Sequence, residues 1–338
     1  MKVLVTGGSG FLGTEILKKL LQRNFKVFNL DLIKSNISGV VNFQIDILDK
    51  KKMNDIFANN VFDIIIHSCA KVPVSRSKES FYDVNVIGTK NILSLAKIHL
   101  IKRFVYVSSS AVYGIPEKVP ILEEDIRVPL EPYGISKKMG EDLCIKEMPY
   151  MNLGIIRPRT VIGKDRLGIF SILFEWIRSN KAVPVINDGK NLYQFIDVDD
   201  LAEAICIMSL SKYVGSLNIG TSSFCSIREL LTGLIEKNHS SSKIKNLDSN
   251  LLFKLFKFLI KKVLPLQEYH YLAYGKDIYF DTSQSKLILK WEPKISNLVS
   301  LQNSYENYIK STKYSHELLA THKKPLKSFL LKYATWFF

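Results

Sequence analysis

Cysteine is scarce in this sequence, and its placement excludes two classes of protein. The chain has four cysteines in 338 residues, with no CxxC pair and no cluster of cysteine with histidine. Small proteins stapled by disulfides and zinc-binding proteins carry closely spaced cysteines. We therefore expect buried, reduced thiols and no metal site. The four are Cys69, Cys144, Cys206 and Cys225.

Long apolar runs are also absent. No stretch reaches the roughly 18 residues that suggest a membrane-spanning helix. The first six residues run straight into glycines and are too short for the apolar core of a secretory signal. These two features predict a cytoplasmic protein.

Arginine is missing from residues 237–338, although the protein as a whole is basic. Residues 237–338 contain 17 lysines against 7 acidic residues, and the whole chain has a formal charge of +15. Most such lysines form a solvated face, but the excess also favours anionic partners such as phosphorylated substrates or acidic lipid. No nucleic-acid motif with interleaved aromatic residues occurs, so we expect no nucleic-acid partner.

Two segments of this basic third, residues 251–262 and 323–338, combine lysines with aromatic and aliphatic residues. Either could lie in a membrane interface, at the inner face, with its lysines toward acidic headgroups. The alternatives are a lid helix packed on the substrate-binding part and a tail docked on the core. The sequence leaves both interpretations open.

Short apolar strands alternate with amphipathic helices over the first 160 residues. This βαβα order predicts a doubly wound parallel sheet of the Rossmann type, with helices on both faces. The predicted strands are 2–6, 25–30, 41–45, 63–67, 103–108 and 152–157, and the predicted helices are 11–23, 50–59, 80–99 and 134–147.

The regular alternation fades after the sixth strand, which suggests a smaller C-terminal α/β domain that binds substrate. We expect an NAD-binding domain over residues 1–165, a substrate-binding region over 166–310 and a basic, apolar tail over 311–338, with 190–220 free to rejoin the first domain. Within this part we expect helices at 168–179, 198–210 and 226–237, a short strand at 216–219 and a surface loop at 238–250.

A glycine-rich turn joins the first strand to the first helix. Such a turn lets backbone N–H groups approach a pyrophosphate, and the helix N-terminus adds positive potential. Alone the motif is weak, but here it stands between a strand and a helix, as this chemistry requires. The expected cofactor-binding residues of the turn are Gly7, Gly10, Phe11, Leu12 and Gly13.

Two acidic positions follow the next strands. Asp31 ends the second strand, 18 residues after Gly13, where a carboxylate can accept both adenosine ribose hydroxyls and repel a 2′-phosphate. It therefore favours NAD over NADP. Asp46 and Ile47, after the third strand, are placed to meet the adenine ring.

Tyr133 and Lys137 stand four residues apart in a predicted helix and so share one face. A lysine ammonium can stabilise the phenolate of a tyrosine that ordinarily ionises near pH 10, and can also bind the nicotinamide ribose. The run from Val107 to Gly114, after the fifth strand, offers serine hydroxyls that could hydrogen-bond a reacting oxygen. These features predict oxidation of a substrate hydroxyl.

Together these motifs resemble the extended short-chain dehydrogenases/reductases, in the NAD-dependent epimerase/dehydratase group that includes UDP-galactose 4-epimerase. The resemblance covers roughly residues 1–300. It implies that Ser109, with Ser110 as second choice, is the catalytic hydroxyl and binds substrate. It also implies that Cys69 and Ala70 line the cofactor cleft, that Asn85 approaches the active site, and that the protein is a homodimer.

The chain departs from this family at informative places. Ser110 and Ala111 stand where the dehydratases carry acidic residues, so dehydration is disfavoured. Thr160 replaces an asparagine, and Tyr193 replaces an arginine that clamps the substrate diphosphate in the epimerases. Either Arg159, Arg166 or nearby lysines take over this role, or the substrate is not an ordinary nucleotide sugar.

The favoured hypothesis is an NAD-dependent epimerase acting on a nucleotide sugar or a lipid-linked sugar diphosphate. Its substrate would bind Ser109, Ser110, Asn85, Thr160 and Tyr193. The alternative is an NAD-dependent dehydrogenase of a hydrophobic hydroxyl substrate, similar to the 3β-hydroxysteroid dehydrogenases, which would release NADH. A binding protein without turnover is disfavoured because both Tyr133 and Lys137 are present.

Overall fold

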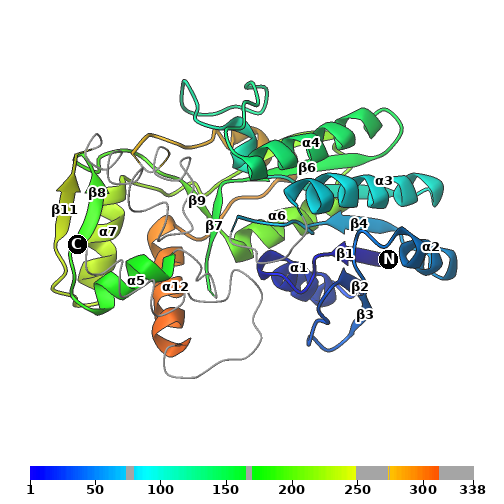
Figure 1. Cartoon of the computed structure of the whole chain (residues 1–338), viewed down its shortest axis with the longest axis horizontal. Helices are drawn as coiled ribbons and strands as arrows, with labels where there is room; N and C mark the ends of the chain where they lie inside the picture. The colour runs from blue at the N-terminus through cyan, green and yellow to red at the C-terminus, as the bar shows by residue number, and fades with distance from the viewer. Residues whose placement is uncertain (74–79, 165–169, 249–272, 274, 312–338) are drawn as a thin grey trace.

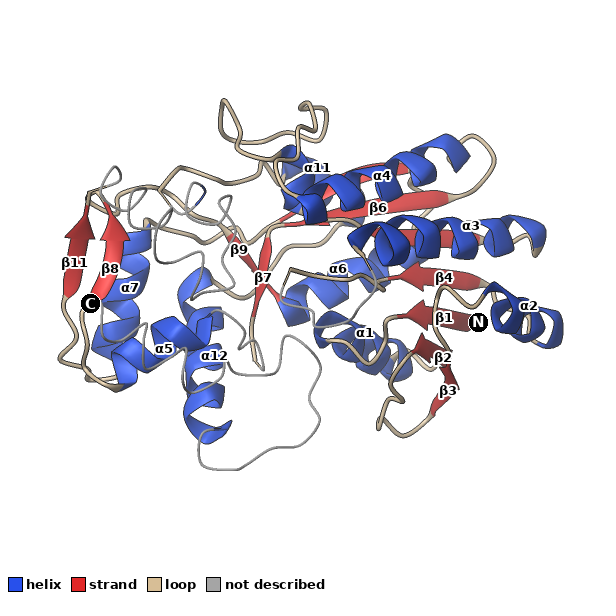
Figure 2. Cartoon of the chain, in the orientation of Figure 1, coloured by secondary structure: helices blue, strands red, loops and turns tan. Residues whose placement is uncertain are grey.

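The computed structural model describes residues 1–73, 80–164, 170–248, 273 and 275–311. These residues form a large parallel sheet flanked by helices, beside a smaller group of elements from the second half of the chain (Figure 1). The secondary-structure view separates the two parts at the short strands β7 (Thr160–Ile162) and β9 (Phe195–Asp197) (Figure 2).

The central sheet has seven strands, all paired in parallel, in the order β10-β6-β5-β4-β1-β2-β3. The order reverses beside β1, which places the carboxyl ends of β1 and β4 at a topological switch point, where ligands bind in such sheets. The predicted doubly wound Rossmann-type fold is therefore confirmed. The strands are β1 (Lys2–Thr6), β2 (Lys26–Asp31), β3 (Val40–Gln44), β4 (Ile64–His67), β5 (Arg103–Val107), β6 (Leu153–Pro158) and β10 (Gly215–Ile219).

Helices cover both faces of this sheet because alternate strand residues point to opposite sides. In β1, Val3 and Val5 join one buried cluster and Leu4 joins the other. The first cluster lies under α1 (Phe11–Gln22) and α6 (Val198–Leu210). The second lies under α2 (Lys50–Asn59), α3 (Gly88–Ile98) and α4 (Pro132–Glu147).

The smaller part is built on a two-stranded parallel ribbon of β8 (Val183–Ile186) and β11 (Ile244–Leu247). The prediction of a surface loop at 238–250 is wrong at this point. The segment 238–250 is mostly polar, so its sequence lacks the apolar pattern of a strand. Residues 244–247 form a strand because they pair with β8. The helices α5 (Phe170–Arg178), α7 (Ile227–Lys237) and α12 (Asn297–Ser311) share its buried cluster, and α11 (Ser283–Leu289) packs near β10.

The predicted helix at 80–99 is interrupted. A π-helical turn, η1 (Asp83–Ile87), precedes α3. In such a turn the backbone hydrogen bonds join residues five apart instead of four. It carries Asn85, whose side chain reaches across to α4. π-helical turns often occur at functional sites, and this one lies beside the predicted active-site helix.

Some expectations concern residues outside the described part of the chain. Both basic apolar segments, 251–262 and 323–338, lie there, as does the beginning of the helix predicted at 168–179. Within the described ranges, no helix combines the length and apolarity needed to cross a bilayer.

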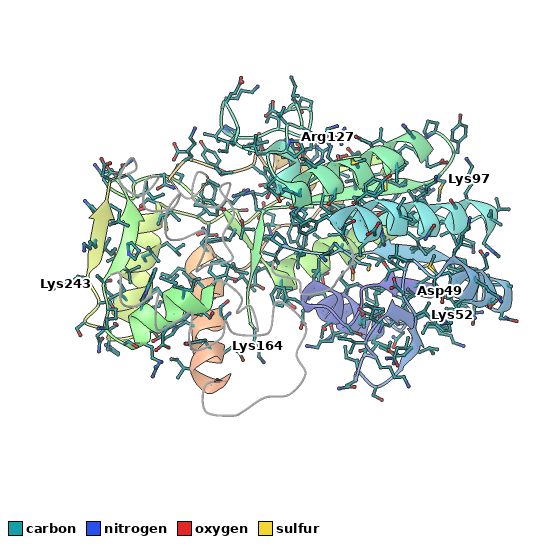
Figure 3. All side chains as sticks on the ribbon, viewed as in Figure 1. Asp49, Lys52, Lys97, Arg127, Lys164 and Lys243 are labelled. Atoms are coloured by element: carbon teal, nitrogen blue, oxygen red, sulfur yellow. The ribbon has the colours of Figure 1, made fainter. Side chains whose placement is uncertain are left out.

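A buried carboxylate fixes α4 onto the sheet. Glu141 has no exposed surface and accepts hydrogen bonds from Arg157 on β6 (Nη2 at 2.6 Å, Nε at 3.0 Å) and from Ser108, which follows β5 (2.5 Å). Arg127, labelled in Figure 3, adds a further bond to the same carboxylate at 3.0 Å. This network joins α4 to β6 and to the segment after β5, and so sets the height of α4 above the sheet.

We expect Glu141→Ala to lower the free energy of unfolding by about 3–5 kcal/mol, because it leaves the buried Arg157 guanidinium without a counter-charge. Urea denaturation checks this. The matched control is Asp142→Ala, which removes the neighbouring, partly exposed carboxylate and its pairs with Arg127 and Lys138. The control should cost below about 1 kcal/mol, and equal losses in the two variants would contradict the assigned role of Glu141.

Candidate active site

The glycine turn is closed tightly against the chain that follows β4. Gly7 has a φ of +74°, and a Cβ there would lie 2.7 Å from the backbone nitrogen of Cys69. A Cβ on Gly13 would lie 2.1 Å from the carbonyl oxygen of Gly7. Only glycine fits these two positions. The predicted turn and the predicted Cys69 position thus meet at the carboxyl ends of β1 and β4.

Gly10 is the N-cap of α1, so the N–H groups of the first helical turn face the glycine turn. Phe11 is buried, and Leu12 packs against the core under α1, so these two side chains anchor the helix. The structure thus leaves the backbone of the turn, rather than its side chains, to contact a ligand.

The Asp31 carboxylate lies at the mouth of this turn. Its oxygens accept hydrogen bonds from the N–H of Ser9 at 3.0 Å and of Ile33 at 3.1 Å, and burial raises its pKa. Remaining lone pairs can accept from hydroxyls of a ribose. The glycine turn, which has no room for a Cβ at Gly7 or Gly13, and the adjacent Asp31 carboxylate together fit a dinucleotide.

The other predicted cofactor residues lie near the turn or in the core. Asp46 accepts the N–H of Leu48 at 2.9 Å, and Ile47 is buried against Gly88 at the beginning of α3. Cys69 and Ala70 are half-buried. Burial raises the pKa of the Cys69 thiol to about 12, so it packs as a neutral thiol at ordinary pH.

Glu131 begins α4 and places Tyr133 in its first turn. Its carboxylate accepts the N–H groups of Tyr133 at 2.8 Å and Gly134 at 2.6 Å. The Tyr133 ring is half-buried and contacts Phe81 edge-on, with ring centroids 6.1 Å apart. The capping carboxylate of Glu131 therefore fixes the position of Tyr133 at the beginning of α4.

Lys137 is buried one helical turn further along α4, with 2% of its surface exposed. Its Nζ donates to the carbonyl of Val107 at 2.7 Å and lies 4.3 Å from the centre of the Tyr106 ring. Burial lowers its pKa to about 8. An ammonium held this close to the end of β5 can favour a phenolate on the same helix face.

The three serines after β5 have different partners. Ser108 donates to Glu141, and Ser110 is buried. Ser109 is half-buried, and its Oγ accepts the N–H of Ala111 at 3.2 Å, which caps the 3₁₀ turn η2 (Ser110–Tyr113). Because Ser109 uses its oxygen and not its proton, its O–H can donate to a substrate oxygen.

Asn85 and His67 are buried and hydrogen-bonded within the protein. The Asn85 amide donates to Ser136 at 2.9 Å and to the backbone of Lys71 at 3.0 Å, which ties α4 to the loop after β4. The His67 ring nitrogens contact Thr6 at 2.6 Å and Thr89 at 2.9 Å, and burial lowers its pKa to about 3. Both side chains position the active-site elements.

The structure brings Thr160, on β7, together with Tyr193, which precedes β9. Their hydroxyl oxygens are 3.1 Å apart, and the Arg159 guanidinium lies over the Tyr193 ring at 5.0 Å. Among the described residues, a cavity of about 540 Å³ lies elsewhere, lined by Lys118, Lys190 and others, and touches none of the predicted catalytic residues.

The model of the NAD dependent epimerase/dehydratase family matches residues 3–220. The chain therefore belongs to this family and is an enzyme of it, with NAD as its cofactor. NAD, when bound, supplies a hydride acceptor, and the residues that would hold it are those of the glycine turn with Asp31 and Lys137.

Two relatives and a solved structure show similarity over most of the chain. An uncharacterized protein of Sinorhizobium fredii is 35% identical, over 97% of this chain and 84% of that one. A putative UDP-glucose 4-epimerase of Methanocaldococcus jannaschii is 35% identical, over 68% and 79%. The fold matches a UDP-glucose 4-epimerase of Thermotoga maritima solved with UDP-glucose, with a TM-score of 0.76 and 23% identity over 92% and 100%.

Sequence reasoning missed three residues that build this site, Glu131, Glu141 and Arg157. Glu141 follows Lys137 by four residues, so it lies on the same helix face and periodicity could have found it. Arg157 gave no such signal, because its partner lies on another element. Ion pairs between residues of different elements can be recognised only from the tertiary structure, where the strands and helices are packed together.

The low pKa of Lys137 predicts a pH-dependent stability. Between pH 8 and 10.5 the unfolded lysine keeps a proton that the folded one has lost, so stability rises with pH there. Compared with Lys137→Met, the wild type should gain on the order of 3 kcal/mol over this range. Urea denaturation of both proteins at several pH values checks it, and a constant difference from pH 7 to 10 would contradict the assigned pKa.

Proposed function

We propose that the protein is an NAD-dependent 4-epimerase of a UDP-linked sugar, with Tyr133, Lys137 and Ser109 as its catalytic residues. The observation that carries the proposal is that α4, the serine turn after β5 and the glycine turn after β1 lie together at the carboxyl ends of the central strands. The relative named as a putative UDP-glucose 4-epimerase supports the choice of substrate class.

In the proposed mechanism the Tyr133 phenolate takes the proton of the reacting hydroxyl. The buried Lys137 ammonium stabilises that phenolate, because an opposite charge favours the ionised form. Ser109 donates a hydrogen bond to the substrate oxygen as charge develops on it. The chemistry that bound NAD supplies is to accept the hydride of the same carbon and to give it back to the opposite face of the resulting keto-sugar. Tyr133 then returns the proton to the oxygen.

Two alternatives are less well supported. Ser110 and Ala111 provide no carboxyl group to eliminate water, which disfavours a dehydratase. A lipid-linked sugar diphosphate, or contact with a membrane, depends on segments 251–262 and 323–338, which are outside the described residues. We also propose a cytoplasmic location, supported by four cysteines that form no disulfide.

We expect Tyr133→Phe to lower turnover by about 10²–10⁴-fold, because it removes the proton acceptor. Nuclear magnetic resonance of UDP-glucose and UDP-arabinose would follow epimer formation, with NADH absorbance measured in parallel. NAD binding should persist, and the control Tyr150→Phe, at a 75% exposed tyrosine, should match wild type. Stoichiometric NADH in place of epimer would indicate a dehydrogenase, and full turnover by Tyr133→Phe would remove the assignment.

We further propose a homodimer through α3 and α4. Ile135 and Met139 lie four residues apart on α4 and are 45% and 38% exposed, and Ile98 at the end of α3 is 71% exposed. Exposed apolar side chains on two neighbouring helices favour association.

Light scattering should give about twice the chain mass of 38.6 kDa for the wild type. Met139→Glu should shift the protein to the monomer, because it places a charge in the apolar interface. The control Val61→Glu changes an apolar residue that is 72% exposed and lies outside both helices. A monomeric wild type would rule the dimer out.

A further inference from the structure

One buried arginine has an unsatisfied guanidinium. Arg159 is 2% exposed, its Nη2 is fully buried, and that atom has no hydrogen-bond partner among the described residues. Its Nε makes a single long bond of 3.3 Å to the carbonyl of Gln194. No carboxylate of the described part of the chain forms an ion pair with it.

The other two arginines that are buried in the described part of the chain are fully hydrogen-bonded, in contrast to Arg159. Arg103 donates to Asn152, Ser211 and the carbonyls of Met208 and Tyr213. Arg157 donates from all three nitrogens, to Glu141, Tyr113 and the carbonyl of Glu123. A guanidinium carries five N–H donors and stays charged, so burying one without acceptors is unfavourable and needs a reason.

Two aromatic rings hold the Arg159 guanidinium in place. Its central carbon lies 5.0 Å from the centre of the Tyr193 ring and 5.5 Å from that of Phe280. Such contacts favour the cation and restrict its orientation while leaving N–H donors unused. Beside it, the hydroxyls of Thr160 and Tyr193 share one hydrogen bond, which leaves the second hydroxyl proton for another acceptor.

We propose that Arg159 receives an oxyanion of the substrate and determines specificity for it. The partner must be an acceptor, because the guanidinium has none of its own, and a negative one, because the buried charge lacks a counter-ion. Two groups share this chemistry: the diphosphate of the nucleotide sugar and a carboxylate on the sugar ring. This inference rests on the proposed function for the identity of the ligand.

The experiment measures binding rather than turnover. Calorimetric titrations with saturating NAD would compare UDP, UDP-galactose and UDP-glucuronic acid on wild type, Arg159→Met and Arg159→Lys. Arg159→Met keeps the apolar stem, and Arg159→Lys keeps the charge but loses the planar fork. The matched control is Arg178→Met on α5, which removes an exposed guanidinium paired with Glu175.

We expect Arg159→Met to weaken the relevant complexes about 10- to 100-fold, with a smaller loss for Arg159→Lys and none for the control. A loss for all three ligands assigns the oxyanion to the diphosphate, and a loss for UDP-glucuronic acid alone assigns it to the sugar carboxylate. The ligand-free melting temperature of Arg159→Met should equal or exceed that of wild type, because an unpaired buried charge is removed.

Unchanged affinities for all three ligands would overturn the inference. So would a marked fall in the melting temperature of Arg159→Met with unchanged binding, which would show a purely structural residue. A wild type that binds these ligands through Arg159 without epimerising them would refute the proposed function alone. An active epimerase whose Arg159→Met variant binds normally would refute the inference alone.

Discussion

The structure depends on the buried charge network around Glu141. A carboxylate with no exposed surface, held by Arg157 and Ser108, fixes α4 at one height over β5 and β6. This network also fixes the positions of Tyr133 and Lys137, the two catalytic residues predicted on α4, because the side chains of one rigid helix move together. Glu131 fixes the beginning of the same helix. The position of Tyr133 is therefore set by Glu131 before it and by Glu141 after it.

Burial then decides how the charged groups behave. Lys137 is enclosed near a backbone carbonyl and an aromatic ring, and burial alone brings its pKa down to about 8. Arg157 is equally buried but keeps a raised pKa because Glu141 faces it. Arg159 has no such partner, and its surroundings are the aromatic rings of Tyr193 and Phe280. The roles proposed for the three cations differ accordingly: catalysis for Lys137, packing of α4 for Arg157 and substrate recognition for Arg159.

Some elements were readable from sequence and others were not. Strongly periodic helices and apolar strands of the first half were predicted close to their observed bounds, and Asp31 was placed beside the glycine turn. The strand β11 was missed because Ile244–Leu247 is short, partly exposed and set in a polar segment, so only its pairing with β8 makes it a strand. The π-turn at Asp83–Ile87 was missed because helical periodicity does not register one inserted residue.

The sequence by itself determined the chemistry that is local along the chain: the glycine turn, the acidic end of β2, and a tyrosine and lysine one helical turn apart. These depend on spacing within single elements, which sequence records directly. Tertiary structure alone decided which polar and charged side chains meet. Arg157 finds Glu141 on another element, Tyr193 finds Thr160 across 33 residues, and Arg159 finds no counter-charge among the described residues. Such pairings follow from packing distant segments together, and no local pattern encodes them.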